Sequence, residues 1–281
     1  MVIKNEGAVV SGKIVYSIVM TAFNRNSQLL ATLQSFNLRG YAGNLEVIIV
    51  DDASKEPVRI DVDDYKFKIQ VITSNADDKW YSNPCIPFNS GLRKASGDVV
   101  IIQNAECYHK TDILNYLDKN YSRLSDEYFS FSCYSVDEVT TQKKEFEDFN
   151  NFLESAPKFD GDNGWYNHSI HRPVGYHFCS AIRRDKLKEV GLFDETYANG
   201  IGYDDDELLF RIKKCLKLII VDDCLVLHQW HYTGGQRNQK LLLRNRLLYK
   251  LYTKRKFSSR FVLSFCLPIY LILLKLRDVF R

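Results

Sequence analysis

The sequence lacks paired cysteines and an obvious export signal. Its seven cysteines are odd in number, and none forms a Cys-x-x-Cys pair. This argues against a disulfide framework and against a structural zinc site, and it favours a reducing compartment. The N-terminus has no basic segment followed by a long apolar run, so we expect no secretory signal and a cytoplasmic protein.

The C-terminal apolar run is too short to cross a membrane. It covers residues 261–274, which is 14 residues interrupted by Pro268, whereas a spanning helix needs about 20. The chain of 281 residues is 45% hydrophobic and 26% charged, which is typical of a globular protein with a sizeable core. We therefore expect one large domain, or one domain with an appendage.

Charge is divided unevenly along the chain. The net charge is +3, but residues 237–281 hold twelve basic residues against one acid, which leaves 26 basic and 34 acidic residues before them. The body is therefore about −8 and the tail about +11. An acidic body argues against a nucleic-acid binder. A basic, apolar tail is expected to lie in an anionic membrane surface, and the alternative is a tail that docks on the protein's own core or forms a dimer contact.

Apolar strands alternate with helices in the first part of the chain. Strands are expected over 14–20, 45–50, 69–73 and 99–103, and leucines at helical spacing follow the first of them. Such alternation predicts an α/β fold with a doubly wound, mostly parallel central sheet and helices on both faces. Further strands are expected over 129–134, 174–182, 218–221 and 224–227, helices over 89–94, 112–124, 184–190 and 236–252, and a polar, mobile insertion over 138–162.

Polar residues follow three of these strands, at 21–25, 51–54 and 104–106. Ligands of open α/β sheets bind outside the carboxyl ends of the strands, so the fold brings these segments to one edge. Side chains two residues apart at a strand end point the same way. The oxygens of Asn104 and Glu106 therefore suit a hard divalent cation.

These strand ends resemble the motifs of the family 2 glycosyltransferases of the GT-A fold. The opening motif resembles residues 19–25, the second resembles residues 49–54, and the resemblance covers roughly 16–232. It implies a nucleotide pocket in which Asp52 bonds the uracil of a UDP-sugar, a role that suits a carboxylate facing an N–H group. The nucleotide-sugar residues implied are Thr21, Ala22, Asn24, Arg25, Asp52, Asn89, Asn104 and Ala105.

The family carries an Asp-x-Asp metal motif where this sequence has Asn104-Ala105-Glu106. Asparagine offers a neutral carbonyl oxygen and glutamate a longer carboxylate, so less local charge is available to hold a metal. In many relatives a histidine after the last strand completes the metal shell, and His228 is a better candidate than His231. The resemblance thus implies Mn²⁺ or Mg²⁺ held by Glu106, Asn104 and His228.

The most specific match covers residues 193–211, a Phe-Asp-Glu followed by a glycine, an aromatic residue and an acid pair that opens a helix. The helix dipole alone also explains acids clustered at a helix N-terminus. The resemblance makes Asp205 the general base and Asp204 its neighbour.

Residues 165–173 are rich in aromatic, imidazole and guanidinium groups, which stack on sugars or bond hydroxyls and phosphates. A packed loop explains them nearly as well. The acceptor-site candidates are Trp165, His171, Arg172 and His231.

The resemblance implies transfer of a sugar, with inversion, from a nucleoside diphosphate donor (UDP favoured) to a hydroxyl of a glycan or lipid-linked saccharide, as in bacterial-type surface polysaccharide synthesis. We expect a catalytic domain over 1–236, with a nucleotide half at 14–106 and an acceptor half at 107–236. A membrane-associating tail over 237–281 would hold the protein peripherally on the inner face of the membrane.

Two other functions fit parts of the sequence. A sugar nucleotidyltransferase would carry a glycine-rich phosphate loop after the first strand, and residues 21–25 are not one. A non-catalytic sugar-binding or scaffold protein is supported only by Asn104 in place of aspartate, and the acid cluster at 204–207 argues against it. Donor sugar, acceptor, linkage and oligomeric state do not follow from the sequence.

Overall fold

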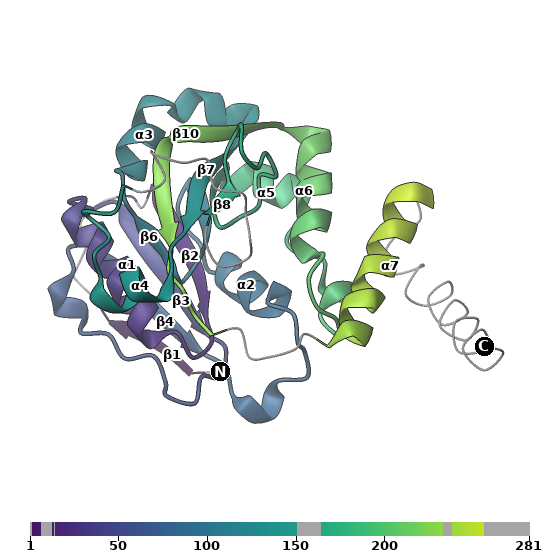
Figure 1. Cartoon of the computed structure of the whole chain (residues 1–281), viewed down its shortest axis with the longest axis horizontal. Coiled ribbons are helices and arrows are strands. Elements are labelled where there is room, and N and C mark those ends of the chain that lie inside the picture. Colours follow the sequence, from purple (N-terminus) through teal and green to yellow (C-terminus); the bar gives the residue numbers. More distant parts are fainter. Residues whose placement is uncertain (1, 7–12, 14, 151–163, 233–237, 256–281) are drawn as a thin grey trace. The chain divides into compact units, whose positions relative to one another are not determined.

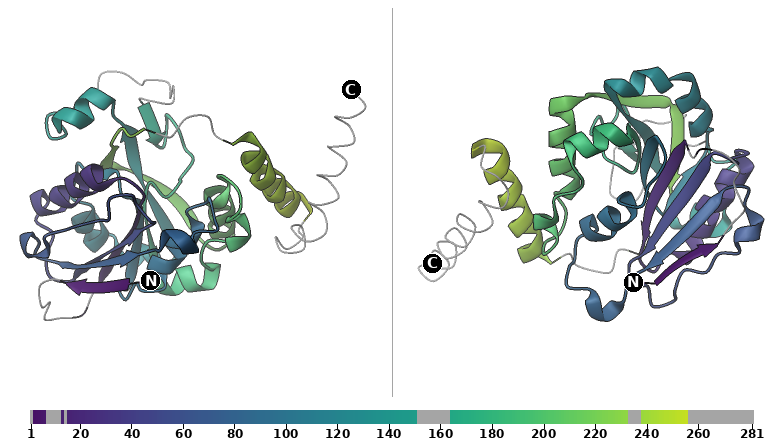
Figure 2. Two further views of the ribbon diagram at one scale, coloured as in Figure 1. Left: turned by 90° about the horizontal axis from the view of Figure 1, so that it is seen from below. Right: turned by 180° about the vertical axis from the view of Figure 1, so that it is seen from behind.

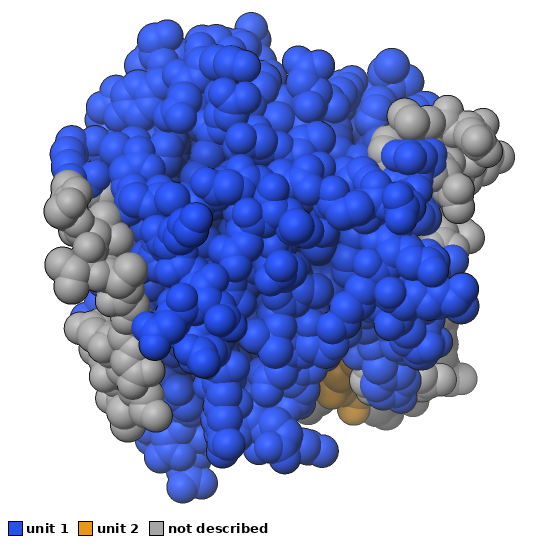
Figure 3. Space-filling view, turned by 90° about the vertical axis from the view of Figure 1, so that its left-hand side faces the viewer, with its two compact units in different colours: residues 1–79, 87–192, 211–232 blue, residues 80–86, 193–210, 233–281 orange. Residues whose placement is uncertain are grey.

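The computed structural model describes residues 2–6, 13, 15–150, 164–232 and 238–255 (Figure 1). Contacts divide the chain into two compact units. Unit 1 comprises Met1–Lys79, Pro87–Leu192 and Arg211–Tyr232, and unit 2 comprises Trp80–Ile86, Phe193–Phe210 and Thr233–Arg281. Figure 3 shows unit 1 in blue and unit 2 in orange.

The described strands form one ten-stranded sheet in the order β1-β4-β3-β2-β5-β9-β7-β10-β6, and β8 pairs with β7 outside this path. Figures 1 and 2 show this sheet from three sides. The strands are β1 (Val2–Glu6), β2 (Tyr16–Ala22), β3 (Leu45–Asp51), β4 (Lys68–Thr73), β5 (Val99–Asn104), β6 (Cys107–His109), β7 (Glu127–Ser135), β8 (Gly164–Asn167), β9 (Cys179–Arg183) and β10 (Lys217–His228).

The α/β fold class is confirmed, but the described sheet is mixed rather than mostly parallel. Strands β4, β3, β2 and β5 are parallel, as the alternation of strands and helices predicts. Beyond β5 the sheet continues with β9, which runs antiparallel to both β5 and β7, and only β7 and β10 are parallel there. The parallel block brings the carboxyl ends of β2, β3 and β5 to one edge.

Seven α-helices lie within the described residues, and none of them is long and apolar enough to cross a membrane. They are α1 (Asn26–Leu38), α2 (Cys85–Leu92), α3 (Ile113–Lys119), α4 (Glu138–Lys143), α5 (Arg184–Val190), α6 (Asp204–Cys215) and α7 (Gln239–Arg255). Short 3₁₀ turns occur at Val62–Asp64, Ala76–Asp78, Tyr121–Ser125 and Glu195–Tyr197.

Helices α1 and α2 cover opposite faces of β2 and β3 (Figure 1). Ile18 and Met20 of β2 belong to one core cluster with Phe36 of α1. Val19 points to the other face, where a Cβ atom on Gly91 of α2 would lie only 2.6 Å from its Cγ1 atom. Glycine is therefore needed for α2 to pack this closely on the sheet.

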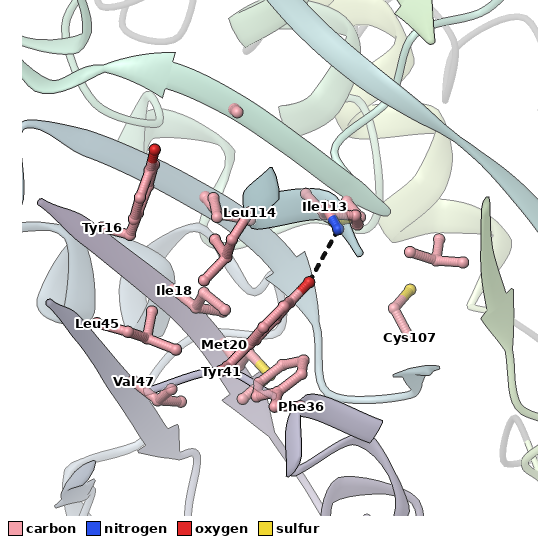
Figure 4. Packing of buried hydrophobic residues seen from close by; sticks show 14 of the residues in the cluster. Tyr16, Ile18, Met20, Phe36, Tyr41, Leu45, Val47, Cys107, Ile113 and Leu114 are labelled. Atoms are coloured by element: carbon pink, nitrogen blue, oxygen red, sulfur yellow. Dashed lines mark hydrogen bonds between the residues drawn. The ribbon is translucent and has the colours of Figure 1, made fainter. Parts of the chain in front are cut away.

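A buried polar network fixes the turn after β5. The Tyr41 hydroxyl accepts a hydrogen bond from the Ile113 amide and lies 3.0 Å from Nδ1 of His109 (Figure 4). Nε2 of His109 lies 2.8 Å from Oε1 of Gln103, and the Gln103 amide donates to the Cys107 carbonyl. Burial lowers the pKa of His109 to about 3. His109 is therefore neutral and connects β6 to β5, the strands on either side of the turn at residues 104–106.

Several elements differ from the prediction. β1, β6 and β8 are additional strands, and each is short or polar enough to lack a clear period-2 pattern. The two predicted strands 218–221 and 224–227 form one strand, β10, in which the exposed Asp222-Asp223 pair occupies a bulge. The predicted insertion begins with a short helix, α4, and its residues 151–163 lie outside the described residues.

The predicted helix at 236–252 is α7, whereas the apolar segment 261–274 lies outside the described residues. The sequence predicts a domain boundary before residue 237, which would place α7 outside the catalytic domain. In the structure, α7 packs within unit 2, where Leu248 and Tyr197 form a small buried cluster. Part of the predicted tail therefore belongs to the folded body.

Candidate active site

The loops after β2 and β3 are bonded to each other. The Asn24 amide donates to Oγ of Ser54, and its side-chain oxygen accepts the Lys55 amide, both at 2.8 Å. Asp51, which is fully buried, accepts the amides of Ser54 and Val58 at 3.0 Å. Asn24 and Asp51 thus shape this edge of the sheet, and the side-chain oxygen of Asn24 is already engaged.

Asp52 forms a compact group with two residues that sequence reasoning misses. Its carboxylate accepts a hydrogen bond from the Lys79 ammonium at 2.8 Å, and the same ammonium lies 3.9 Å from the centre of the Phe23 ring. The Phe23 ring is 47% exposed although it is apolar. Phe23 lies inside the motif at 21–25, but Lys79 follows a loop with no sequence signal.

The other predicted nucleotide residues differ in what they expose. Thr21 and Asn104 pair in adjacent strands and are both partly exposed at the sheet edge. The side chains of Ala22 and Ala105 are instead buried in the core cluster that contains Phe36 of α1. Asn89 is buried in α2, with 1% of its surface exposed. Only the backbone of the two alanines is left to face a ligand.

Glu106 and Arg25 form the central ion pair of this edge. Nε of Arg25 donates to Oε1 of Glu106 at 2.8 Å, and Nη2 of Arg25 lies 2.7 Å from Nδ1 of His231. Nε2 of His231 lies 3.6 Å from the same glutamate oxygen. The pair is largely buried, with 20% of the Arg25 side chain and 11% of the Glu106 side chain exposed.

His228 lies at the end of β10, as expected. Burial lowers its pKa to about 4, although the nearby Glu106 carboxylate opposes the shift. The pKa of His231 is also lowered by burial. Both imidazoles are therefore neutral at pH 7, the form in which histidine binds a metal.

The predicted metal ligands are chemically suitable, but Glu106 is already paired with Arg25. Among the described residues, no group of three or more His, Cys, Asp and Glu side chains is arranged to hold a metal ion. A carboxylate, an amide oxygen and a neutral imidazole are nevertheless donors that Mn²⁺ accepts. The set Glu106, Asn104 and His228 fits such a cation, provided that Glu106 is not committed to Arg25.

The acceptor candidates fall into separate groups. The Trp165 and His171 rings are stacked with centres 5.8 Å apart, and Trp165 is only 5% exposed. The Arg172 guanidinium lies 5.8 Å from the centre of the Tyr166 ring, and Tyr166 lies 4.9 Å from His228. His231, another candidate, contacts Arg25 and Glu106, and its ring centre lies 5.4 Å from that of His228.

In unit 2 the acid pair opens α6 as predicted. Asp204 is 3% exposed and accepts a hydrogen bond from the side-chain amide of Asn83 at 2.7 Å. Asp205, the next residue, is partly exposed. Tyr203, just before them, has a left-handed backbone with φ of +65°. Asp204 is thus suited to fix the start of the helix and Asp205 to meet a ligand.

Asn245 of α7 holds the segment that precedes this acid pair. It is fully buried, and its amide donates to the carbonyls of Tyr197 and Gly202 at 3.0 and 2.8 Å. Its oxygen accepts a hydrogen bond from Arg244 at 2.7 Å. A Cβ atom on Gly200 would lie 2.0 Å from that oxygen. Asn245 is not predicted from the sequence, because a lone asparagine in a basic helix does not indicate a buried polar contact.

The fold has counterparts among solved structures. TarS of S. aureus in complex with UDP-GlcNAc superposes with a TM-score of 0.55 at 16% identity, over 79% of this chain and 60% of TarS. A mannosyltransferase from Pyrobaculum calidifontis in complex with GDP-Man and Mn²⁺ gives 0.52 at 14%, over 94% and 74%. GalNAc-T7 with UDP, GalNAc and Mn²⁺ gives 0.52 at 18%, over 87% and 51%.

The chain spans about 60% of the length of the TarS structure. Among curated protein sequences, none matches it significantly. The sequence model named Glycosyl transferase family 2 matches residues 17–191, which is more than half of the chain and includes β2, β3, β5 and the residues that follow them. This chain therefore belongs to glycosyl transferase family 2.

Proposed function

We propose that this glycosyltransferase moves a hexosyl group from a nucleoside diphosphate donor, with UDP favoured, to a hydroxyl of a glycan or lipid-linked saccharide. The observation that carries the donor class is the group formed by Asp52, Lys79 and Phe23. A carboxylate accepts the N–H of a uracil, and an exposed aromatic ring offers a face on which a base stacks. Lys79 supplies a cation near the donor.

The diphosphate end of the donor would lie toward Thr21, Asn104 and Glu106. We propose a divalent cation, Mn²⁺ or Mg²⁺, as cofactor, with Glu106, Asn104 and His228 as its protein ligands. Such a cation offsets the charge of a leaving diphosphate. The solved GalNAc-T7 and mannosyltransferase structures both contain Mn²⁺, which supports this choice of metal.

We assign Asp205 as the general base. Its carboxylate would take the proton of the acceptor hydroxyl, whose oxygen then bonds to the anomeric carbon as the bond from that carbon to the diphosphate breaks. A single displacement of this kind inverts the configuration. Partial exposure of Asp205, beside a buried Asp204 bonded to Asn83, supports this division of roles. A general base contributes about 10²–10⁴-fold to the rate.

The acceptor would contact the exposed ring of His171, which is stacked on the buried Trp165, and the guanidinium of Arg172, because sugar faces stack on aromatic rings and guanidinium groups bond hydroxyls. His231 would contribute from the side of Glu106. An acceptor of the polysaccharide or lipid-linked type agrees with a protein held at a membrane.

We propose that the C-terminal segment attaches the protein to the inner face of an anionic membrane. Lys240, Leu243, Arg246 and Lys250 are exposed at helical spacing on α7. Residues 256–281 continue with basic and apolar residues. Such a surface binds anionic headgroups through charge and the acyl boundary through apolar side chains.

The donor assignment is tested by binding calorimetry with UDP, GDP and dTDP. We expect UDP to bind most tightly, and Asp52→Asn to weaken UDP binding about tenfold, because it removes a charged hydrogen-bond acceptor. Asp78→Asn, a change at an exposed acid of the same loop region, is the matched control. Equal binding of UDP and GDP by the wild type would argue against uracil recognition.

A further inference from the structure

Arg25 binds Glu106, a proposed ligand of the cation, and also contacts His231. Its Nε donates to Oε1 of Glu106 at 2.8 Å, and its Nη2 contacts Nδ1 of His231 at 2.7 Å. Further donors reach the carbonyls of Asn24 and Tyr232, at 3.0 and 3.3 Å. Residues from the first loop and from the end of β10 therefore converge on one guanidinium.

The contact with Arg25 also sets the form of His231. A guanidinium only donates hydrogen bonds, so Nδ1 of His231 must be the accepting nitrogen. The proton of the neutral ring then lies on Nε2, which faces Glu106 at 3.6 Å. In this form neither ring nitrogen offers a lone pair toward the carboxylate, and His231 supports the ion pair rather than a metal.

Charge is balanced at this edge. Glu106 carries the only negative charge among the proposed metal ligands, since Asn104 is neutral and an imidazole such as His228 is neutral or positive. Arg25 already neutralises that charge. A divalent cation entering beside Glu106 would meet a guanidinium within hydrogen-bond distance of the same oxygen, and the two positive groups repel.

We infer that Arg25 and the divalent cation compete for Glu106, so that the free protein is held in a cation-excluding state by its own arginine. This rests on the proposed cofactor. The diphosphate of a bound donor supplies negative charge to both Arg25 and the divalent cation. The two positive groups then no longer compete for Glu106 alone, so the cation and the nucleotide bind with positive coupling. By linkage, each raises the affinity of the other by the same factor.

The inference is tested by measuring Mn²⁺ binding to the full-length protein without nucleotide, from the electron paramagnetic resonance signal of free Mn²⁺. We expect Arg25→Gln to bind Mn²⁺ at least about tenfold more tightly than the wild type, which is about 1.4 kcal/mol. Adding Glu106→Gln to this variant should abolish the gain. Arg25→Lys keeps the charge and should bind Mn²⁺ about as weakly as the wild type.

Arg123→Gln is the matched control, because Arg123 forms an ion pair of the same 2.8 Å length with Glu127. It should leave Mn²⁺ binding unchanged, and circular dichroism of every variant checks folding. Equal Mn²⁺ affinity of wild type and Arg25→Gln, including undetectable binding by both, overturns the competition. Donor turnover is measured separately, so that result leaves the proposed transferase function standing.

Discussion

The two adjacent aspartates at the start of α6 have different surroundings. Asp204 is buried and bonded to Asn83, whereas Asp205 is partly exposed. If Asp205 is the base, Asp205→Asn should lower kcat by at least about 100-fold and leave UDP affinity unchanged, because a base acts only in the chemical step. Steady-state kinetics and calorimetry on the same preparation measure both quantities.

Asp206→Asn is the control for this change, since Asp206 lies on the same first turn of α6 and is also partly exposed. It should retain most of the activity. An Asp205→Asn enzyme within about tenfold of the wild type would exclude Asp205 as the base, because a lost base costs more than that.

Buried histidines make the stability of unit 1 depend on pH. The pKa of His109 is lowered to about 3 by burial, from an ordinary value of 6.5. Below pH 6.5 the unfolded chain binds a proton at His109 that the folded protein excludes, so the free energy of unfolding falls as pH falls toward 3. Between pH 7 and 5 this amounts to about 2 kcal/mol.

Urea unfolding at pH 7 and 5 measures the effect. His109→Gln should lose stability at both pH values, but its decrease between them should be smaller by about 2 kcal/mol. His228, whose pKa is lowered to about 4, remains in the variant and retains its own pH dependence. An unchanged decrease in His109→Gln would mean that this histidine is protonated in the folded state.

At the scale of elements, α7 holds the segment that precedes the acid pair of α6. Asn245→Ala removes two hydrogen bonds to the segment before Asp204. We expect a loss of about 1–3 kcal/mol in unfolding free energy and a lower kcat, because the acid pair is held less firmly. Arg246→Ala, at the exposed neighbouring position, should change neither quantity.

The contact between Asn245 and Gly200 can also be tested by changing Gly200. Gly200→Ala places a Cβ atom against the Asn245 amide and should reproduce the loss of kcat. If Asn245→Ala lowers stability while kcat at a temperature well below Tm stays unchanged, α7 supports the fold but does not position the acid pair.

The regular elements follow from local patterns in the sequence. The runs that form β2, β3 and β5 are continuous and apolar, so their ends are found to within about two residues. The elements that were missed depend on contacts distant in sequence. β6 has only three residues and forms because it pairs with β10. In the sequence, Asp222 indicates the end of a strand, but in the structure it lies inside β10 and accepts hydrogen bonds from Ser132 and Ser169.

At the scale of the molecule, the motif segments predict which loops form the proposed site but not what each side chain does. Asp52, Glu106 and Asp205 are candidates because strand ends and helix starts carry recognisable acids. Lys79 and Asn245 were not predicted because their contacts come only from partners far along the chain. The burial of Ala22 and Ala105 could not be predicted, since it depends on how α1 packs on the sheet.

The proposed membrane attachment depends on the C-terminal segment. Deleting residues 257–281 should release it from anionic vesicles without unfolding the body, because the described contacts of α7 precede the cut. High salt alone should weaken binding only partly, since it screens the charges but not the apolar side chains. Co-sedimentation with anionic and neutral liposomes measures this. Full-length protein that remains soluble with both would make the segment a self-docking or dimer element.

The proposed transfer from a UDP-sugar is tested most directly by measuring the release of nucleoside diphosphate from a panel of UDP-sugars and GDP-mannose, with and without Mn²⁺. We predict that the wild type releases UDP from at least one UDP-sugar, that excess EDTA suppresses the release, and that Asp205→Asn abolishes it. Release from no UDP-sugar but from GDP-mannose, or release that Asp205→Asn leaves intact, would contradict the account.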